Sequence, residues 1–320
     1  MISKDFIQIA IHTVDLNDLE YSFCYPIDQA GEVIEYKDQR SYPPILVIEK
    51  PSGYQVIDGM NRVLYLASTG ESTIEAFILK IRPPLGLLRG GILYAQTYKS
   101  LNIIEKASIL HKLIHPFQVD KSVVINHYLP LLHVNPSSKL FKWLMKLNDL
   151  SHEMKDHVLQ DNIPLNLAYD LAQYTSSDQA ILYQWIKKLK LGVNRLKFFL
   201  ESLNFVCHRD QMSVEGILNS NIFAHYLNSK TKQSTLEKNF IDDLYTLRYP
   251  AYKEHLDKVQ ELIRTFKLPP RWKIIIPKNM EGEGFHIHFQ IKNREEYPLA
   301  LEKLEAIHKN MGIDQLFTYL

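Results

Sequence analysis

The sequence predicts an α+β protein of several domains: a small α/β domain at the N-terminus, an all-helical middle that contains a helix-turn-helix, and a small α/β domain at the C-terminus made of a hairpin and a helix. Three observations lead to this assignment. Short apolar runs separated by turn residues come first, amphipathic segments follow one another through the middle, and alternating apolar runs return near the end. We expect the domains at residues 1–98, 99–250 and 251–320.

The N-terminal domain is predicted as a unit of two strands, a helix and a further strand. Residues 43–50 and 54–59 have the apolar and β-branched composition of strands, with a Pro-Ser-Gly turn between them. Residues 61–70 place apolar side chains at helical spacing and end at a glycine, and residues 73–80 return to strand composition. The proline pair and the three glycines within 83–91 indicate a junction before the helical middle.

The helical middle includes a predicted helix-turn-helix. Its two amphipathic segments, 121–134 and 138–150, are separated by Asn-Pro-Ser-Ser, which supplies a tight turn and an N-cap for the second helix. Further helices are predicted at 151–160, 164–174, 178–190, 193–206, 213–219 and 234–245. In the C-terminal domain, we expect strands at 272–277 and 285–291, a Glu-Gly-Glu-Gly connection at 281–284, and a helix at 295–309.

Composition and charge exclude several classes of protein. Apolar residues make up 46% of the chain, enough for a core in each domain, and the two cysteines fit neither a disulfide framework nor a zinc site. No run is long and apolar enough to span a bilayer, so we expect a cytoplasmic protein without a membrane partner. Residues 1–90 carry 8 basic and 12 acidic residues, whereas 91–200 carry 13 and 8. A positive middle third is expected of a module that faces phosphates.

The string VIDGMNRVLYLASTG at 56–70 is the most informative motif, because it places a strand, a glycine turn and an arginine at the start of a helix. Gly59 would let the backbone approach a phosphate, the helix N-terminus would supply free N–H groups, and Arg62 would add bidentate donors. Asp58 could orient Arg62 or hold a cation. The alternative is a purely structural turn, which would have the same sequence.

This string resembles the glycine-arginine signature of the ParB/sulfiredoxin-like superfamily, in which a Gly-x-x-Arg turn joins a strand to a helix. The resemblance covers roughly residues 40–205. The segment LNIIEKASILHKLI is similar to a Leu-Asn helix of that family, with matches at Leu101, Asn102, Glu105 and Ala107, and the predicted helix-turn-helix follows in the same order.

Family members that act in partition bind CTP through this turn and a second box, and clamp DNA as dimers. The resemblance therefore implies double-stranded DNA as a partner, CTP or another nucleotide with Mg²⁺ as a ligand, and a homodimer. The pocket is expected to be degenerate, because Met60, Asn61 and Leu64 replace charged residues of the turn, and Tyr94 and Ala95 replace a Glu-Asn pair of the second box. The predicted nucleotide or phosphate ligands are Asp58, Gly59, Asn61, Arg62, Asn102 and Glu105.

Two other functions stay open. Related kinases of the superfamily phosphorylate free serine and carry an Asp-Gly-x-x-Arg form of the turn, which residues 58–62 match, so a kinase or a weak CTPase-like nucleotidase is an alternative. A non-catalytic protein-interaction scaffold is the other. A single arginine without a carboxylate cluster favours a non-catalytic role, and we assign no catalytic residue.

Basic side chains predict where DNA would bind. Lys139, Lys142 and Lys146 recur at i, i+3 and i+7 along one face of the second helix of the pair, opposite an apolar face. A second basic run includes Lys187, Lys188 and Arg195, which could follow backbone phosphates. Either set could equally be a solvated helix face. His286 and His288 share one face of a predicted strand, but without a third ligand we predict packing and no metal site.

Overall fold

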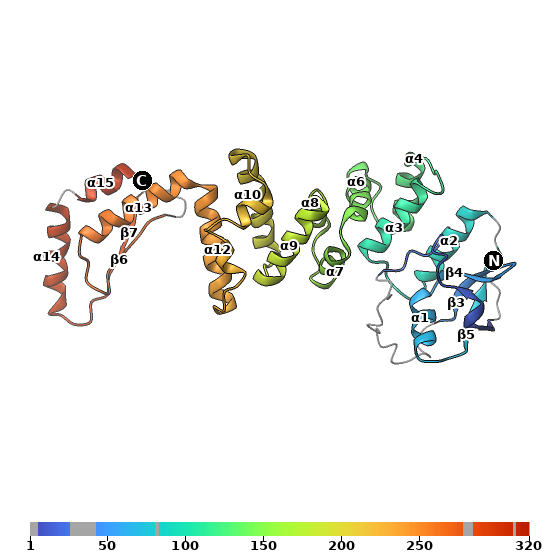
Figure 1. Ribbon diagram of the computed structural model, residues 1–320. Coiled ribbons are helices and arrows are strands. Elements are labelled where there is room, and N and C mark those ends of the chain that lie inside the picture. The colour runs from blue at the N-terminus through green and yellow to red at the C-terminus, as the bar shows by residue number, and fades with distance from the viewer. Residues whose placement is uncertain (1–5, 26–42, 81–82, 278–283, 310–311, 320) are drawn as a thin grey trace. The chain divides into compact units, whose positions relative to one another are not determined.

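The structure is a computed structural model that describes residues 6–25, 43–80, 83–277, 284–309 and 312–319 (Figure 1). Its contacts divide the chain into two compact units, Met1–Lys197 and Phe198–Leu320. The first unit contains the predicted N-terminal domain and most of the predicted helical middle, and the second contains the rest. The domain boundaries predicted at residues 98 and 250 stay predictions.

The first unit begins with a mixed five-stranded sheet of order β1-β5-β3-β4-β2. The central strand β3 runs parallel to β5 and antiparallel to β4, while β1 pairs antiparallel with β5 and β2 pairs parallel with β4. The predicted strands are therefore confirmed, and two short strands precede them. The strands are β1 (Ile7–Ala10), β2 (Val14–Asp15), β3 (Ile45–Lys50), β4 (Gly53–Asp58) and β5 (Thr73–Ile78).

Two helices pack on this sheet. Helix α1 (Met60–Ser68) buries Met60 and Val63 in a cluster with Val47 and Val56 of the sheet. Ile57 is the next residue along β4, and side chains alternate between the two faces of a strand, so it points to the other face. There it contacts helix α2 (Pro84–Ala95).

The predicted junction at 83–91 is wrong, because this segment forms α2. Pro84 occupies the first turn of the helix, where its missing N–H leaves no hydrogen bond unmade. A Cβ on Gly91 would lie 2.5 Å from Ile57 Cγ2, and one on Gly90 would lie 2.9 Å from Leu79 Cδ2. The glycines therefore allow close packing of the helix on the sheet and do not mark a break.

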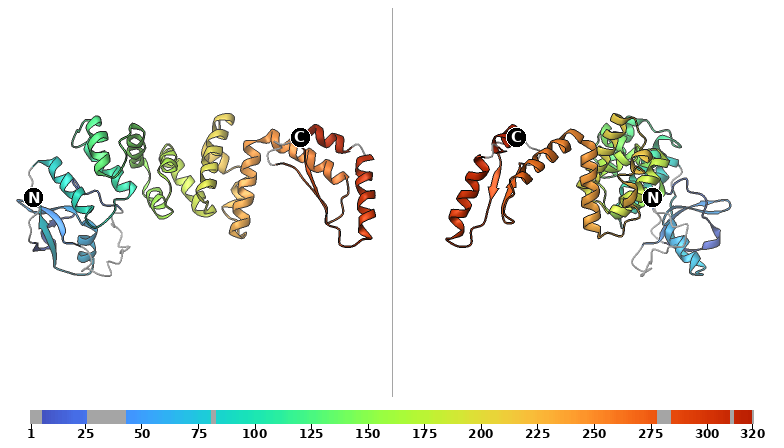
Figure 2. Two further views of the ribbon diagram at one scale, coloured as in Figure 1. Left: turned by 180° about the vertical axis from the view of Figure 1, so that it is seen from behind. Right: turned by 60° about the vertical axis from the view of Figure 1, so that its left-hand side comes forward.

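The remainder of the first unit is helical, as predicted (Figures 1 and 2). Helix α3 packs against α6, and α6 packs against α8. The helices are α3 (Ile103–Ile114), α4 (Lys121–Val123), η3 (Val124–Tyr128), α5 (Leu129–Leu131), α6 (Ser138–Lys146), η4 (Leu147–Asp149), α7 (His152–Gln160), α8 (Leu165–Leu171), α9 (Ser176–Leu189) and the start of α10 (Val193–Asp210).

The segment 121–131 is one helical stretch with a π-helical centre. The backbone N–H of Leu129 donates to the carbonyl of Val124, five residues back. A proline inside an α-helix clashes with the carbonyl four residues before it, and the wider π turn that precedes Pro130 relieves this clash. This stretch and α6, joined by residues 132–137, occupy the positions of the predicted helix-turn-helix.

The second unit combines helices with a two-stranded sheet. The predicted hairpin pairs β6 (Lys273–Ile275) with β7 (His286–His288), and these strands lie between α13 and α14 in Figures 1 and 2. Residues 281–283 of the predicted connection lie outside the described residues, while Gly284 has the expected positive φ of 90°. The helices are α11 (Val214–Leu218), η5 (Ala224–Tyr226), α12 (Gln233–Arg248), α13 (Pro250–Thr265), α14 (Glu296–Lys309) and α15 (Gly312–Tyr319).

Helices α13 and α15 were not predicted. Helix α13 is rich in charged residues and buries only Val259 completely, so its apolar stripe is narrow. Val259, Phe266, Ile307 and Leu316 form the small core of the hairpin region. Among the described residues, no helix is long and apolar enough to cross a bilayer.

Gly91→Ala tests the close packing of α2. The added methyl group would overlap Ile57, and we expect the free energy of unfolding to fall by about 1–3 kcal/mol. Urea denaturation of the full chain measures this change. Arg89→Ala, at an exposed position of the same helix, is the control, and its stability should change by less than about 0.5 kcal/mol. Equal stability of the two variants would contradict the packing role.

Candidate phosphate corner and nucleic-acid interface

The predicted strand–glycine–helix corner is confirmed. Strand β4 ends at Asp58, and Gly59 is the N-cap of α1 with a left-handed φ of 103°. A Cβ on Gly59 would lie 2.6 Å from Ile45 Cγ2 and 2.8 Å from Arg62 Nη2. Both the backbone angle and the close approach therefore require glycine. The geometry brings the N-terminus of α1 and the Arg62 guanidinium together.

Arg62 is held inside the protein. Its side chain is 11% exposed, Nη1 donates a hydrogen bond to the Pro43 carbonyl, and Nη2 lies 3.8 Å from Asp58 Oδ2. The guanidinium carbon lies 5.5 Å from the centre of the Tyr98 ring, a cation–π distance. Nη2 is buried and makes no hydrogen bond within the part of the chain that the structure describes. Arg62 is thus engaged in an internal ion pair with one donor group still unused.

Asp58 and Tyr98 complete this cluster, which we call the arginine corner: Asp58, Gly59, Arg62 and Tyr98. The Tyr98 hydroxyl donates a hydrogen bond to Asp58 Oδ2. Burial and the nearby Asp58 carboxylate raise the pKa of Tyr98 well above its usual range, so the phenol keeps its proton and remains a donor. The buried Asp58 carboxylate therefore has both a charged and a neutral partner.

Tyr94 occupies one of the two positions where the family resemblance implies a Glu-Asn pair. Its hydroxyl donates to the Pro44 carbonyl at 2.5 Å, and its ring packs edge-on against Phe77 and Tyr98. Burial raises the pKa of Tyr94 to about 12. A neutral, hydrogen-bonded phenol thus stands at this position.

Asn102 and Glu105 form the capping box of α3. Asn102 Oδ1 accepts from the backbone N–H of Glu105 at 2.9 Å, and Glu105 Oε2 accepts from the N–H of Asn102 at 3.0 Å. Glu105 Oε1 also lies 2.6 Å from Lys99 Nζ. The side chains of Asn102 and Glu105, which were predicted to bind a nucleotide, are therefore engaged in capping α3 and, for Glu105, in the ion pair with Lys99. Asn61, the remaining member of the predicted set, is buried on α1.

Cys24 lies near two buried ion pairs, Asp58–Arg62 and Lys99–Glu105. Burial raises the pKa of its thiol to about 11, and the Lys99 ammonium opposes this rise. The thiol is therefore protonated at neutral pH and acts as a small apolar side chain.

Lysines and aromatic rings lie together on the surface formed by α6 and α8. Lys139 Nζ lies 4.5 Å from the centre of the Trp143 ring, and Lys142 Nζ lies 5.8 Å from that of Tyr169 on α8. The two rings are 5.7 Å apart at an interplanar angle of 31°. Lys139 and Lys142 are both exposed. We call these four residues the lysine–aromatic face.

The rest of α6 positions this face. Phe141 and Leu144 are buried on the opposite side of the helix, and the Ser137 hydroxyl accepts from the Leu140 N–H at the N-cap. Lys146, the third predicted lysine, is partly neutralised because its Nζ lies 2.7 Å from Asp149 Oδ2. Two of the three lysines of the stripe therefore keep their charge available.

The second basic run lies on α9 and the start of α10. Lys187 is exposed and its Nζ lies 5.7 Å from the centre of the Tyr183 ring, while Lys188 is half-buried and Arg195 is exposed. A common surface shared with the lysine–aromatic face stays a prediction. In the other unit, His286 and His288 are exposed on β7 with ring centres 6.5 Å apart. No group of three metal-ligating side chains occurs among the described residues.

Sequence reasoning missed the aromatic partners of both sites. Tyr98 lies in the turn after α2 and Tyr169 lies on α8, so both come from other segments than the charged residues they contact, and their spacing in sequence gives no direct signal. The one available signal was the pair Lys139 and Trp143, which lie at i and i+4 on one helix face.

No protein-family model matches the sequence, and no curated protein matches it. Solved structures similar to this chain include C-terminally truncated chromosome-partitioning protein ParB from Caulobacter crescentus, complexed to the centromeric parS site: 19% identity over 61% of this chain and 98% of that chain, TM-score 0.32. The same protein complexed with CTP-γ-S is 18% identical over 57% of this chain and 98% of that chain, with TM-score 0.21. Both TM-scores lie below 0.5, so the function has to be argued from this chain's own residues.

Arg62→Ala tests whether the arginine corner supports the fold. Removing the guanidinium leaves the buried Asp58 carboxylate without its cation, and we expect the free energy of unfolding to fall by about 3 kcal/mol. Urea denaturation measures the change. Arg89→Ala, which removes an exposed arginine of α2, should change stability by less than about 0.5 kcal/mol. An unchanged stability of Arg62→Ala would mean that the guanidinium is available to a ligand at no cost to the fold.

Proposed function

We propose that this chain binds double-stranded DNA through the lysine–aromatic face of α6 and α8. The observation that carries the proposal is the pair of exposed lysines, Lys139 and Lys142, whose ammonium groups lie over the neighbouring, tilted rings of Trp143 and Tyr169. A ring face attracts a cation without neutralising its charge. The two lysines are therefore ordered and still able to contact backbone phosphates.

The dimensions of α6 suit a recognition helix. An α-helix with its side chains is about 10–12 Å in diameter, which fits the major groove of B-DNA, about 12 Å wide, and the nine residues of α6 form about two and a half turns. The helical stretch 121–131 before it and the connecting residues 132–137 provide the first helix and turn of a helix-turn-helix. In this arrangement the exposed face of α6 enters the groove while Phe141 and Leu144 anchor it to the protein.

The distribution of charge supports the same face. The net charge of the whole chain is +1, yet the segment 91–200 holds 13 basic and 8 acidic residues. Lys187, Lys188 and Arg195 lie in this segment and would add phosphate contacts beside the groove. The few cations available imply moderate affinity that depends strongly on salt. A dimeric assembly would double the contacts, and we propose a homodimer on duplex DNA.

The double variant Lys139→Gln, Lys142→Gln tests this proposal. Each lysine that contacts a phosphate adds about 0.9 to the slope of log K against log salt, so we expect the slope to decrease by about 2 and affinity to fall at low salt. Fluorescence anisotropy with a labelled duplex over a series of salt concentrations measures both. Lys146→Gln should have a smaller effect, because Asp149 already pairs with this lysine.

Lys253→Gln is the matched control for the loss of a surface charge. This lysine pairs with Asp257 on α13 in the other unit, and its replacement should leave the salt slope unchanged. Wild-type protein that fails to bind any duplex at low salt would overturn the proposal. A double variant with the wild-type slope would show that DNA contacts a different face.

A nucleotide ligand at the arginine corner is the second candidate function. Gly59 has no side chain and so lets a ligand approach the backbone at the N-terminus of α1. The buried Arg62 Nη2 lacks a hydrogen bond among the described residues. We propose that the phosphates of CTP or another nucleotide with Mg²⁺ enter here and regulate DNA binding without being consumed. Entry requires Arg62 to leave Asp58, whose carboxylate repels a phosphate.

Asp58→Asn and Arg62→Ala give opposite predictions for this ligand. Asp58→Asn removes the competing charge while an amide can still accept from Tyr98, so CTP affinity should rise by about tenfold. Arg62→Ala should abolish binding. Calorimetric titration of the folded variants with CTP, ATP and ADP in the presence of Mg²⁺ measures these changes. Identical titrations for both variants would place any nucleotide elsewhere.

A further inference from the structure

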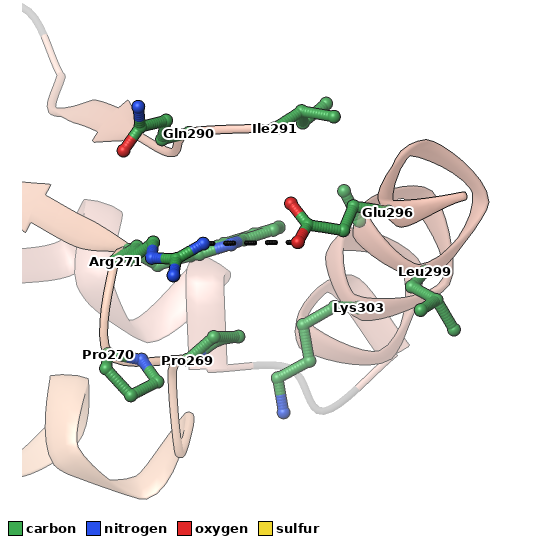
Figure 3. A pocket seen from close by; sticks show the side chains of 10 residues that line it. Pro269, Pro270, Arg271, Gln290, Ile291, Glu296, Leu299 and Lys303 are labelled. Carbon is green, nitrogen blue, oxygen red and sulfur yellow. Dashed lines mark ion pairs between the residues drawn. The ribbon is translucent and has the colours of Figure 1, made fainter. Parts of the chain in front are cut away.

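A pocket of about 320 Å³ lies in the second unit, far along the chain from the arginine corner and the lysine–aromatic face. Figure 3 shows the turn before β6 on one side of it, the residues after β7 above, and α14 on the other side. We propose that this pocket binds a short acidic peptide, with a carboxylate between Arg271 and Lys303 and an apolar side chain against the walls. It is lined by Pro269, Pro270, Arg271, Trp272, Gln290, Ile291, Glu296, Leu299, Ala300 and Lys303.

The walls of the pocket are built by two local structures. The Trp272 N–H donates to the Pro269 carbonyl at 2.8 Å, which closes a β-turn with Pro270 at its favoured second position and Arg271 at the third. On the other side, Asn293 caps α14 by accepting from the Glu296 N–H at 2.9 Å. Arg271 and Glu296 are thereby presented to the pocket from fixed backbone, so the site is largely formed without a ligand.

The two cations of the pocket, Arg271 and Lys303, are not fully neutralised by its single carboxylate, Glu296. Glu296 Oε2 already accepts from the Lys292 N–H at 2.9 Å, and its other oxygen lies 3.9 Å from Arg271 Nη1, too far for a hydrogen bond. Lys303 forms no ion pair with any other residue that the structure describes. A ligand carboxylate would supply both cations with a hydrogen-bonded partner.

The remaining residues that line the pocket favour a peptide over other anionic ligands. Leu299, which is 63% exposed, lines the pocket together with Trp272 and Ile291, so apolar area is available to cover a ligand side chain. The Gln290 amide offers both a donor and an acceptor, which matches a peptide group. The Glu296 carboxylate in the same pocket disfavours a polyanion such as nucleic acid.

Two peptides of equal size test the proposal: acetyl-Leu-Asp-Phe-Glu-amide and its neutral match, acetyl-Leu-Asn-Phe-Gln-amide. They are titrated into the full-length chain while the NMR signal of the Trp272 indole N–H is followed. We expect the acidic peptide to shift this signal and to bind at least about tenfold more tightly than the neutral one. Equal affinities, or no shift with either peptide, would overturn the proposal.

Two variants separate the pocket from a general effect of charge. Arg271→Gln and Lys303→Gln should each reduce affinity for the acidic peptide toward that of the neutral one. Lys309→Gln changes the net charge equally at the far end of α14 and should leave affinity unchanged. Binding of phosphatidylserine vesicles or duplex DNA that depends on Arg271 and exceeds binding of the peptide would also overturn the proposal. These readouts do not depend on the DNA-binding proposal.

Discussion

The buried ion pair between Asp58 and Arg62 is the interaction on which the N-terminal domain depends. Taking both charges out of water is unfavourable, and at 3.8 Å the pair alone recovers only part of that cost. The Pro43 carbonyl, the Tyr98 hydroxyl and the Tyr98 ring supply the remaining contacts. Since these partners come from the segment before β3, from β4 and from the residues after α2, one cluster fixes three parts of the chain at the corner.

The same cluster explains why an external anion could reach the corner only in competition with an internal carboxylate. Gly59 and the N-terminus of α1 create a place for negative charge, and Asp58 already supplies one. An external phosphate must therefore displace an internal carboxylate. Its binding would be coupled to a rearrangement of Arg62, and this coupling is a physical basis for regulation by a ligand.

The fold could be predicted where local pattern decides it. The apolar and β-branched composition of residues 43–58, the glycine at 59 and the repeat of lysines along 138–146 correctly predicted two strands, a turn and a helix face. Sequence could not show that Arg62 turns inward, because its partner Pro43 is 19 positions away. Gly90 and Gly91 indicated a break for the same reason: only the folded sheet reveals that Leu79 and Ile57 lie under them.

Aromatic rings contact the cations at both charged sites, but with different consequences. A carboxylate that holds a cation also offsets part of its charge, and Lys146 illustrates the consequence, since Asp149 partly neutralises it. The faces of Trp143 and Tyr169 hold Lys139 and Lys142 by a weaker interaction that leaves the ammonium groups free to bind. At Arg62, by contrast, the Tyr98 ring is combined with a carboxylate, and the cation is buried. The difference between an available and an occupied cation on this chain thus depends on whether a carboxylate accompanies the ring.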